Sequence, residues 1–291
     1  MTSDELALPS YEQLRDRDGS PDGSSWGLWG RDDVFGTLNL LNPQRIIEAA
    51  GEVREGLTIS LNASLTAFEP PLFGRDPLKH DVQAFSDGRV RDETISDFNT
   101  QCSSQWDGFR HVKSSPHGFY NGHIESDLSV SDWSRRGIVG RGVLLDAERW
   151  FAESGRPIVQ TEPFAIGVED LAGMIGALER PLREGDILVL HTGWLDYRVA
   201  NSDPSGGSFR SPGLEPGPDM LAFLWDTHCA AIVADNPSLE IWPPGANADK
   251  ATRAAARASK CDNAHIFMHY QLIGLLGAWV GSGLMGPRVC A

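Results

Sequence analysis

Three short apolar runs, separated by segments with helical periodicity, constrain the fold of this chain more than any other feature. The runs lie within Gly137–Asp146, Gly185–Trp194 and Ala230–Ser238. Apolar residues recur with helical spacing over Val168–Glu179 and Pro218–Thr227, the two segments between these runs. Buried strands that alternate with helices are typical of an α/β fold. The sequence therefore predicts this fold class.

Further elements are predicted outside this region. Asn42 suits an N-cap and Pro43 a first helical turn, so a helix is expected over Pro43–Val53. Its buried face should carry Ile46, Ile47 and Ala50. Apolar and polar residues alternate over Leu57–Asn62, which predicts a strand. Residues 66–100 are rich in Pro, Gly and Asp and predict a long surface excursion, ending in a strand that leads into Gln101.

Composition limits the domain organisation. The 291 residues are 41% hydrophobic and include nine Trp, which is enough for a sizeable core. The turn and coil residues of Asp16–Ser25 favour an N-terminal arm over residues 1–28, followed by a single domain over 29–291. No internal repeat, heptad pattern or nucleotide-binding glycine loop is present.

Charge and cysteine content limit the partners and the compartment. A net charge of −15 makes nucleic acid and anionic membranes poor partners, and a small molecule is the expected ligand. No apolar run is long enough to span a bilayer, and the acidic start is unlike a signal peptide. The four cysteines lack metal-type spacing, so free thiols in a reducing cytoplasm are expected.

The polar stretch Gln101–His111 is the candidate site. Asp107 and His111 are four residues apart, and Gln101 and Gln105 keep the same step upstream. On a helix this spacing places side chains on one face, and on a tight loop it lets them converge. Aspartate, histidine and amide oxygens suit a hard or borderline divalent ion. The alternative is a solvated surface loop.

Other histidines offer weaker candidates. His117 and His123 could form a site with His111, or they belong to a polar loop. His265 and His269 are four apart in an apolar helical pattern over Ala264–Val280, which suits either metal binding or core packing. His191 ends a predicted strand, where sites often collect, although a hydrogen-bonded core or rim histidine is favoured.

The candidate site resembles the H-x-G-T-H-x-D-x-x-x-H motif of the cyclase family of metal-dependent hydrolases, which includes bacterial kynurenine formamidase and isatin hydrolase. Asp107 and His111 match this motif, whereas Gln101 and Gln105 stand where the family has metal-ligand histidines. The run Gln105–Gly108 is similar to the Q-W-D-G of longer family members.

Further motifs extend the resemblance over roughly Trp29–Leu276. They are Trp29–Leu41 (W-G-x-x-D-x-x-G-x-x-N-x-L), Gly142–Asp146 (G-V-L-L-D), Gly185–Trp194 (G-D-x-L-x-x-x-T-G-W), Asp235–Ser238 (D-x-P-S) and His269–Leu272 (H-x-x-L). The region Trp279–Leu284 lacks the family's metal-binding Glu, and the last residues lack its W-D-L-D/E ending. Because a one-base shift turns a Met-Gly codon pair into Trp, we hypothesise a shifted reading frame in this tail.

The resemblance implies a swivelling β/α fold with a mixed, mainly β core wrapped by helices, assembled as a homodimer or homotetramer. It implies a hydrolase of a small cyclic or aryl amide, or lactone, similar to arylformamidase. A divalent Mn or Zn ion would be held by Gln101, Gln105, Asp107 and His269. His111 and Asp107 would be catalytic. The expected substrate-binding residues are Trp106, Phe109, Tyr120 and Asn121.

Two alternatives stay open. The first is a metal-independent cyclase or dehydratase of a natural-product intermediate, in which His111 and Asp107 form an acid–base pair. The second is a degenerate binding protein that retains the fold without catalysis. The His-to-Gln differences favour these alternatives, and the combined presence of Asp107, His111 and His269 favours the hydrolase.

Overall fold

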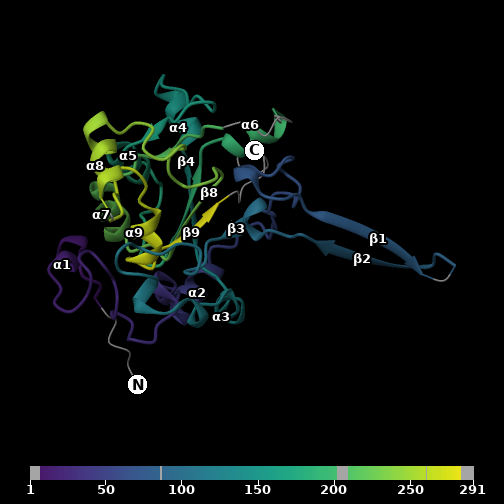
Figure 1. Cartoon of the computed structure of the whole chain (residues 1–291), viewed down its shortest axis with the longest axis horizontal. Coiled ribbons are helices and arrows are strands. Elements are labelled where there is room, and N and C mark those ends of the chain that lie inside the picture. Colours follow the sequence, from purple (N-terminus) through teal and green to yellow (C-terminus); the bar gives the residue numbers. More distant parts are fainter. Residues whose placement is uncertain (1–6, 86, 202–208, 260, 283–291) are drawn as a thin grey trace.

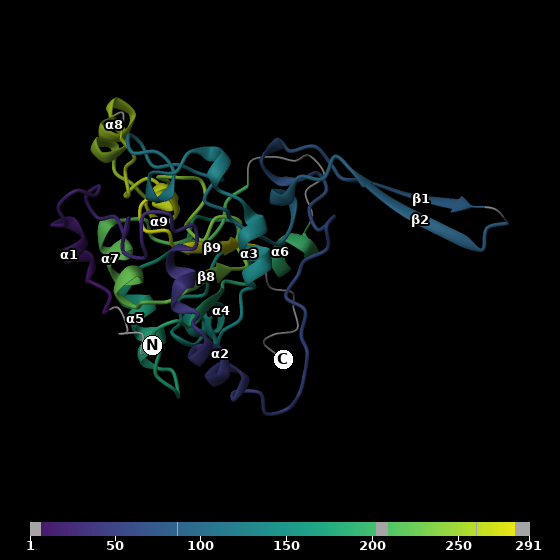
Figure 2. The ribbon, with the colours of Figure 1, turned by 90° about the horizontal axis from the view of Figure 1, so that it is seen from below.

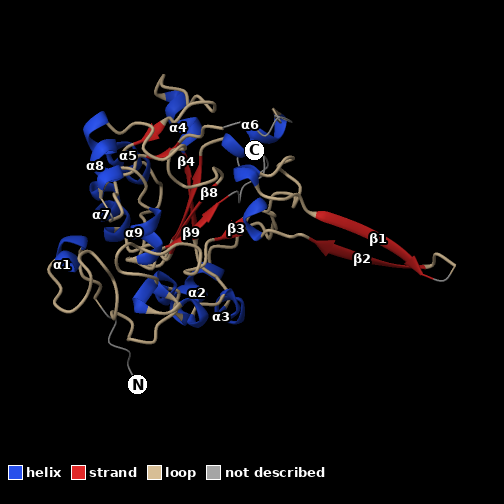
Figure 3. Cartoon of the chain, viewed as in Figure 1, coloured by secondary structure: helices blue, strands red, loops and turns tan. Residues whose placement is uncertain are grey.

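The computed structural model describes residues 7–85, 87–201, 209–259 and 261–282. Its centre is a five-stranded sheet in the order β3-β9-β8-β6-β4. These strands are β3 Gln105–Trp106, β9 Trp279–Ser282, β8 Ala231–Ala234, β6 Ile187–His191 and β4 Gly142–Asp146. The last four are mutually parallel, and β3 runs antiparallel to β9. Helices surround the sheet (Figure 3), which confirms the predicted α/β class.

The remaining elements lie around this sheet. The α-helices are α1 Tyr11–Arg15, α2 Pro43–Ala50, α3 Val130–Arg136, α4 Ala147–Glu153, α5 Val168–Gly176, α6 Trp194–Ala200, α7 Pro218–Asp226, α8 Lys250–Ala258 and α9 His269–Gly274. Short 3-10 helices are η1 Gly36–Leu40, η2 Leu72–Gly74, η3 Thr100–Cys102, η4 Tyr120–Gly122 and η5 Glu125–Asp127. Strands β5 Ala165–Ile166 and β7 Gly213–Leu214 pair in parallel, and β1 Lys79–Phe85 pairs with β2 Val90–Ser96 in an antiparallel hairpin.

The three apolar runs form strands β4, β6 and β8 of the sheet, as predicted. Strand β8 is buried along its whole length, as the middle strand of a sheet covered on both faces must be. Its neighbour β6 pairs with β8 on one side and β4 on the other, with Val189 opposite both Val233 and Leu144. Helices α5 and α7 begin at the predicted residues, and they end three residues and one residue earlier than predicted.

The predicted helix over Ala264–Val280 is wrong. Only His269–Gly274 is α-helical, and the chain then turns at Gly277 and enters the sheet as β9. Gly277 has φ +56°, which favours glycine, and its carbonyl accepts a hydrogen bond from Thr37 N at 3.0 Å. The apolar run therefore supplies both a short helix and a buried strand.

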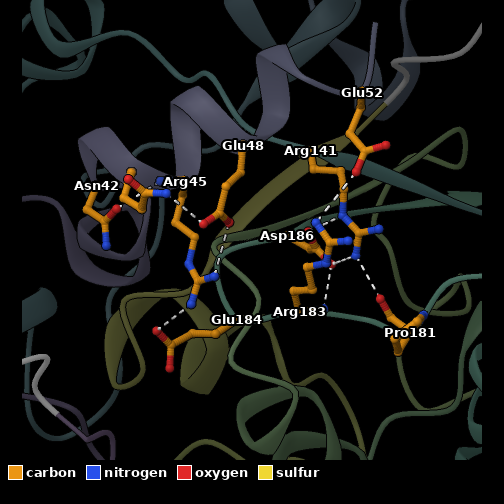
Figure 4. A network of polar contacts seen from close by, with 10 residues as sticks. Asn42, Arg45, Glu48, Glu52, Arg141, Pro181, Arg183, Glu184 and Asp186 are labelled. Carbon is orange, nitrogen blue, oxygen red and sulfur yellow. Dashed lines mark hydrogen bonds and ion pairs between the residues drawn. The ribbon is translucent and has the colours of Figure 1, made fainter. Parts of the chain in front are cut away.

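Helix α2 has the predicted cap but not the predicted burial. The Asn42 side chain accepts a hydrogen bond from Arg45 N at 3.0 Å. However, no residue of the helix is buried, and Ile47 is 66% exposed, so the expected inward face is wrong. Polar contacts link this region to the turn before β6 (Figure 4): Arg45 pairs with Glu184 at 3.6 Å, and Glu52 pairs with Arg183.

The motif Trp29–Leu41 is organised by one carboxylate. Asp33 Oδ1 accepts from Asn39 Nδ2 at 2.7 Å, and its Oδ2 accepts from Gly36 N at 2.8 Å and from the Tyr120 hydroxyl at 2.9 Å. Gly36 lies so close to the turn after α9 that an added Cβ would be 2.2 Å from the Gly277 carbonyl oxygen. This motif therefore fixes the turn that feeds β9 into the sheet.

The N-terminal segment packs onto α7. Trp225 Nε1 donates to the Pro9 carbonyl at 2.8 Å, and Tyr11 N donates to Asp226 Oδ1 at 2.7 Å. The division of the chain at residue 28 stays a prediction. None of the helices in the described ranges is sufficiently long and apolar to span a membrane.

The excursion over residues 66–100 contains the β1–β2 hairpin, which projects away from the body (Figures 1 and 2). Every residue of both strands is exposed. The predicted strand over Leu57–Asn62 is wrong, because this segment has no regular secondary structure and makes no backbone hydrogen bond to another described residue.

Candidate active site

A cavity of about 240 Å³ lies at the edge of the sheet where the parallel strands β8 and β9 end. Asp235 directly follows β8, Ser282 ends β9, and Gln105 begins the antiparallel β3 at the same edge. Side chains that follow the carboxyl ends of parallel strands meet there, as is usual in α/β proteins. The polar lining comprises Arg75, Gln101, Ser103, Gln105, Asp107, His111, Asp235, Asn236, Ser238, His269 and Ser282.

A buried chain of three ionisable groups forms the floor of the site. His269, the first residue of α9, contacts Glu240 Oε1 through Nδ1 at 2.8 Å and Asp107 Oδ2 through Nε2 at 3.3 Å. The other Glu240 oxygen accepts from Met268 N at 2.6 Å. Asp107 and Glu240 are 3% and 0% exposed, so these contacts replace the water that both carboxylates would otherwise bind.

This arrangement keeps His269 protonated. Burial alone would lower the pKa of His269, but the hydrogen bonds and charges of Asp107 and Glu240 outweigh burial and raise its pKa to about 9. Burial opposes ionisation of Asp107 as well, yet His269 and Gln101 bring the pKa of Asp107 below its ordinary value. Burial raises the pKa of Glu240. The imidazolium thus lies between two acidic side chains.

His111 lies beside this chain and faces the cavity. Its Nε2 is 3.9 Å from Asp107 Oδ1, and 34% of its side chain is exposed. Burial is the largest influence and lowers the pKa of His111, and the charge of His269 acts in the same direction. A histidine with a lowered pKa is neutral at physiological pH and can accept a proton.

Neutral amides complete the polar wall. Gln101 Nε2 donates to Asp107 Oδ1 at 3.0 Å, and Gln105 Nε2 donates to Gln101 Oε1 at 3.2 Å. Gln105 also donates to the hydroxyl of Ser282, which falls in the region where the resemblance expects a glutamate. The structure therefore brings Gln101, Gln105, Asp107 and His269, the predicted ligand set, to one place.

The donor chemistry of this set does not fit a resident divalent ion. The two imidazole nitrogens of His269 point at carboxylates, and binding a metal would require His269 to lose a proton held with a pKa of about 9. The amide oxygens of Gln101 and Gln105, at the positions of the family's histidines, are weaker ligands than imidazole. Within the described ranges, no group of three or more His, Cys, Asp and Glu side chains is placed to hold a metal. The Mn or Zn ion implied by the resemblance stays a prediction.

The cavity also has an aromatic wall with one cation. The aromatic residues are Phe68, Phe73, Trp194, Trp242 and Phe267, and Phe267 stacks on His269. The Arg75 guanidinium lies 4.5 Å from the centre of the Phe73 ring and donates to the Gln101 carbonyl at 2.8 Å. Such a wall suits a small planar aromatic molecule with a polar or anionic substituent.

The four predicted substrate-binding residues do not line this cavity. Trp106 packs edge-on against Trp279, and Phe109 is 1% exposed in the core. Tyr120 is buried and donates to Asp33, while the Asn121 amide donates to the carbonyls of Gly30 and Arg31. Tyr120 and Asn121 hold the Trp29–Leu41 motif against the core, because their polar atoms find partners there and not in the cavity.

The remaining candidate histidines have other surroundings. His123 contacts the Asp33 carbonyl at 3.0 Å, and His117 is exposed, so the two do not join His111 in a site. His265 lies near Gly217, in a separate surface groove. His191 is a buried rim histidine, as expected, with Nδ1 at 3.2 Å from Asp146.

The thiols are not placed for catalysis. Cys102 is buried, and burial raises its pKa, which disfavours the reactive thiolate. Cys229 and Cys261 are also free thiols, as expected. Cys290 and the tail on which the reading-frame hypothesis rests lie outside the described residues.

Sequence reasoning missed Glu240, Arg75 and most of the aromatic wall. Glu240 lies just beyond the Asp235–Ser238 motif at the end of β8, where site residues often collect, so its position offered a signal. Arg75 and Phe73 belong to the Pro- and Gly-rich excursion, whose path no local pattern gives.

Comparison with known proteins agrees with this architecture. The sequence profile of the "Putative cyclase" family matches residues 56–241. A crystal structure described as a novel cyclase is 26% identical, with a TM-score of 0.71 over 90% of this chain and 86% of that one. No curated protein matches the chain.

Isatin hydrolases share the fold at lower identity. Isatin hydrolase A from Labrenzia aggregata, bound to benzyl benzoate, is 17% identical, with a TM-score of 0.53 over 79% of this chain and 80% of that one. Isatin hydrolase A from Ralstonia solanacearum is 14% identical, with a TM-score of 0.51 over 78% of this chain and 79% of that one.

Proposed function

Because the chain belongs to the cyclase family, we propose that it is an enzyme that hydrolyses a small cyclic or aryl amide, or the corresponding lactone, with His111 as the base. One observation carries the proposal: His111 faces an aromatic cavity next to the buried Asp107–His269–Glu240 chain. The isatin hydrolases with the same fold act, by their names, on a cyclic aryl amide, which fits the aromatic wall.

In this mechanism the substrate ring lies against the aromatic wall, and a water molecule lies between its carbonyl carbon and His111. His111 takes a proton as the water oxygen bonds to the carbon, and Asp107 stabilises the imidazolium that forms. The Arg75 guanidinium and the side-chain amides face the developing oxyanion. When the C–N bond breaks, His111 returns the proton to the leaving nitrogen.

His269 and Glu240, the two residues behind Asp107, have a positioning role. His269 holds one Asp107 oxygen, and Gln101 holds the other. Glu240 fixes His269 in turn through Nδ1. Asp107 is thereby oriented toward His111 while it stays ionised.

The test uses the full chain, purified without affinity metal, on a panel of aryl formamides, isatin-type cyclic amides and aryl lactones. We expect turnover that survives chelator, and incorporation of one oxygen from ¹⁸O-labelled water. His111→Ala should lower kcat about 10²–10⁴-fold. The matched control His117→Ala removes an exposed histidine outside the cavity and should leave kcat unchanged.

Two results would change the assignment. Turnover that disappears with chelator and returns with Mn or Zn, together with about one ion per chain, would support the metal-dependent hydrolase instead. Unchanged turnover in His111→Ala would remove His111 from the mechanism.

A metal-independent cyclase or dehydratase is the second candidate. The observation in its favour is the donor set, which offers an acid–base group but no fitting metal site. Because cyclisation and dehydration do not add a water oxygen to the product, the same labelling experiment separates this candidate from the hydrolase.

A further inference from the structure

We propose that Arg75 binds a carboxylate of the substrate, which makes the substrate an aryl amide or lactone with an acidic group close to the reacting carbonyl. We call the Arg75 guanidinium and the cavity wall around it the anion site. The substrate class rests on the proposed hydrolysis, whereas the anion site depends only on the structure of the cavity.

Arg75 is a cation without a counter-ion in the wall of the cavity. Its side chain is only partly exposed, and it takes part in no ion pair with any residue that the structure describes. The two carboxylates of the cavity lining are engaged elsewhere. Asp107 Oδ2 contacts His269, and Asp235 Oδ1 accepts from the Thr192 hydroxyl at 2.7 Å. Because a charge removed from water needs a partner, the site lacks an anion that a ligand can supply.

The charge of Arg75 is opposite to that of the molecule as a whole. The chain carries −15, which repels an anionic ligand at long range. Burial lowers the pKa of Arg75, and nearby groups do not offset this effect, although a guanidinium stays protonated in proteins. A carboxylate beside Arg75 restores the interaction that burial removes. This local attraction is what allows an acidic substrate to bind to an acidic protein.

The guanidinium is oriented before any ligand binds. Arg75 Nη1 donates to the Gln101 carbonyl at 2.8 Å, and the guanidinium carbon lies 4.5 Å from the centre of the Phe73 ring. Edge-on contacts hold Phe73 in turn, with ring centres 5.2 Å from Phe209 and 5.0 Å from Trp242. The φ of Phe73 is +64°, which is unfavourable for an aromatic residue, and strained residues of this kind concentrate at ligand-binding sites.

The donors of Arg75 are enough for two acceptors on one substrate. The Gln101 carbonyl uses a single N–H group, and the others have no hydrogen-bond partner among the described residues. A carboxylate takes two of them in the planar fork geometry, and the oxyanion can take another. Burial has the largest influence on the pKa of His111, and the charge of Arg75 also acts on it, so the two side chains are close. The acidic group therefore lies near the carbonyl that water attacks.

The test compares two substrates that differ in one group, 2-formamidobenzoate and the neutral 2-formamidobenzamide. We expect the wild type to favour the carboxylate about 10- to 100-fold in kcat/KM, mainly through KM, which is the range of a charged hydrogen bond. Arg75→Gln should bring this ratio close to one. Because loss of the oxyanion contact slows both substrates alike, the ratio isolates the carboxylate contact.

Two further variants control this comparison. Arg75→Lys keeps the charge but loses the planar fork, so its ratio should lie between those of the wild type and Arg75→Gln. Arg54→Gln removes an exposed arginine outside the cavity and should keep the wild-type ratio.

Binding of benzoate and of the similarly shaped, neutral nitrobenzene, followed by ligand-observed NMR, needs neither turnover nor a variant. The wild type should bind benzoate at least about 10-fold more tightly, and Arg75→Gln should bind the two equally. If neither formamide is hydrolysed while this preference holds, the proposed reaction fails and the anion site stands. If both are hydrolysed with a ratio near one, and the wild type binds benzoate no better than nitrobenzene, the anion site is overturned and the hydrolysis stands.

Discussion

His269 is a buried imidazole between two carboxylates, and this position links the stability of the protein to pH. Its pKa rises from 6.5 to about 9 on folding. A raised histidine pKa contributes stability that is complete below the unfolded pKa and is lost as pH rises through the folded one. We therefore expect the free energy of unfolding to fall between about pH 6.5 and pH 9, by an amount on the order of a few kcal/mol.

Chemical denaturation at a series of pH values measures this dependence. His269→Gln should be less stable than the wild type at pH 6.5 and should lose most of the slope above it. His117→Gln, at an exposed position, should retain the slope. A wild-type stability that stays flat from pH 6.5 to 9 would mean that His269 does not gain a proton on folding.

Gln101 and Gln105 are the residues in which the site departs most clearly from the motif that it resembles. The Gln101 amide contacts Asp107, and the Gln105 amide contacts Gln101 and Ser282. Imidazoles at positions 101 and 105 would therefore lie next to each other and close to Asp107. We expect the wild type to hold far less than one Mn or Zn ion per chain. The double variant Gln101→His with Gln105→His should bind about one, because two imidazoles and Asp107 form a competent donor set.

Metal analysis after dialysis measures this difference. Addition of Asp107→Asn to the double variant should abolish binding and is its control. About one metal ion per chain in the wild type would show that the Gln101 and Gln105 amides suffice as ligands. It would favour the metal-dependent mechanism over the metal-independent one.

The elements at this site are joined by a close backbone contact between η1 and the turn after α9. Gly36 and Gly19 both have positive φ, but only Gly36 has a neighbour, the Gly277 carbonyl oxygen at 2.2 Å from an added Cβ. We expect Gly19→Ala to cost about 1–2 kcal/mol of unfolding free energy, the ordinary penalty of this conformation. Gly36→Ala should cost about 2 kcal/mol more, because the backbone must move apart.

Thermal or urea unfolding of the two variants makes the comparison, and Gly19→Ala is the matched control for the conformational penalty. If both variants lost the same unfolding free energy, the backbone at η1 and at the Gly277 turn could move apart without loss of stability.

At the scale of elements, local patterns predicted the interior better than the periphery. The runs that form β4, β6 and β8 are apolar because both sheet faces are covered. A near-continuous apolar run is therefore visible in the sequence at each of these strands. The 264–280 run failed because a helix and a buried strand are both apolar, and only the long-range contact at Gly277 separates them. Helix α2 has the amphipathic pattern that was predicted, but its apolar side chains Ile46 and Ile47 are exposed.

The candidate site shows the same limit. Asp107, His111 and His269 were predicted from local motifs, and the structure brings them together. Arg75 reaches the cavity, and Glu240 reaches His269, from segments far away in sequence, and spacing carries no information about such contacts. Tyr120 and Phe109 were expected at the substrate, because an aromatic side chain looks the same in sequence whether it lines a core or a pocket.

At the scale of the whole molecule, the net charge of −15 opposes the self-association that the family resemblance implies, whereas burial of exposed apolar side chains such as Ile47, Val82 and Ile95 would favour it. Salt screens repulsion between like-charged copies, with a Debye length of about 30 Å at 0.01 M and about 8 Å at 0.15 M. It leaves apolar burial largely intact. We therefore expect the dissociation constant to fall about threefold to tenfold between roughly 0.02 M and 0.3 M sodium chloride.

Sedimentation velocity at several salt concentrations measures this trend. The sign of the salt effect identifies the force that holds the copies together. If salt weakened the wild-type complex, ion pairs between copies would dominate, and apolar burial would not be its main source of affinity. If salt strengthens it, the long-range field of the chain and its apolar surface act in opposition, and apolar burial prevails.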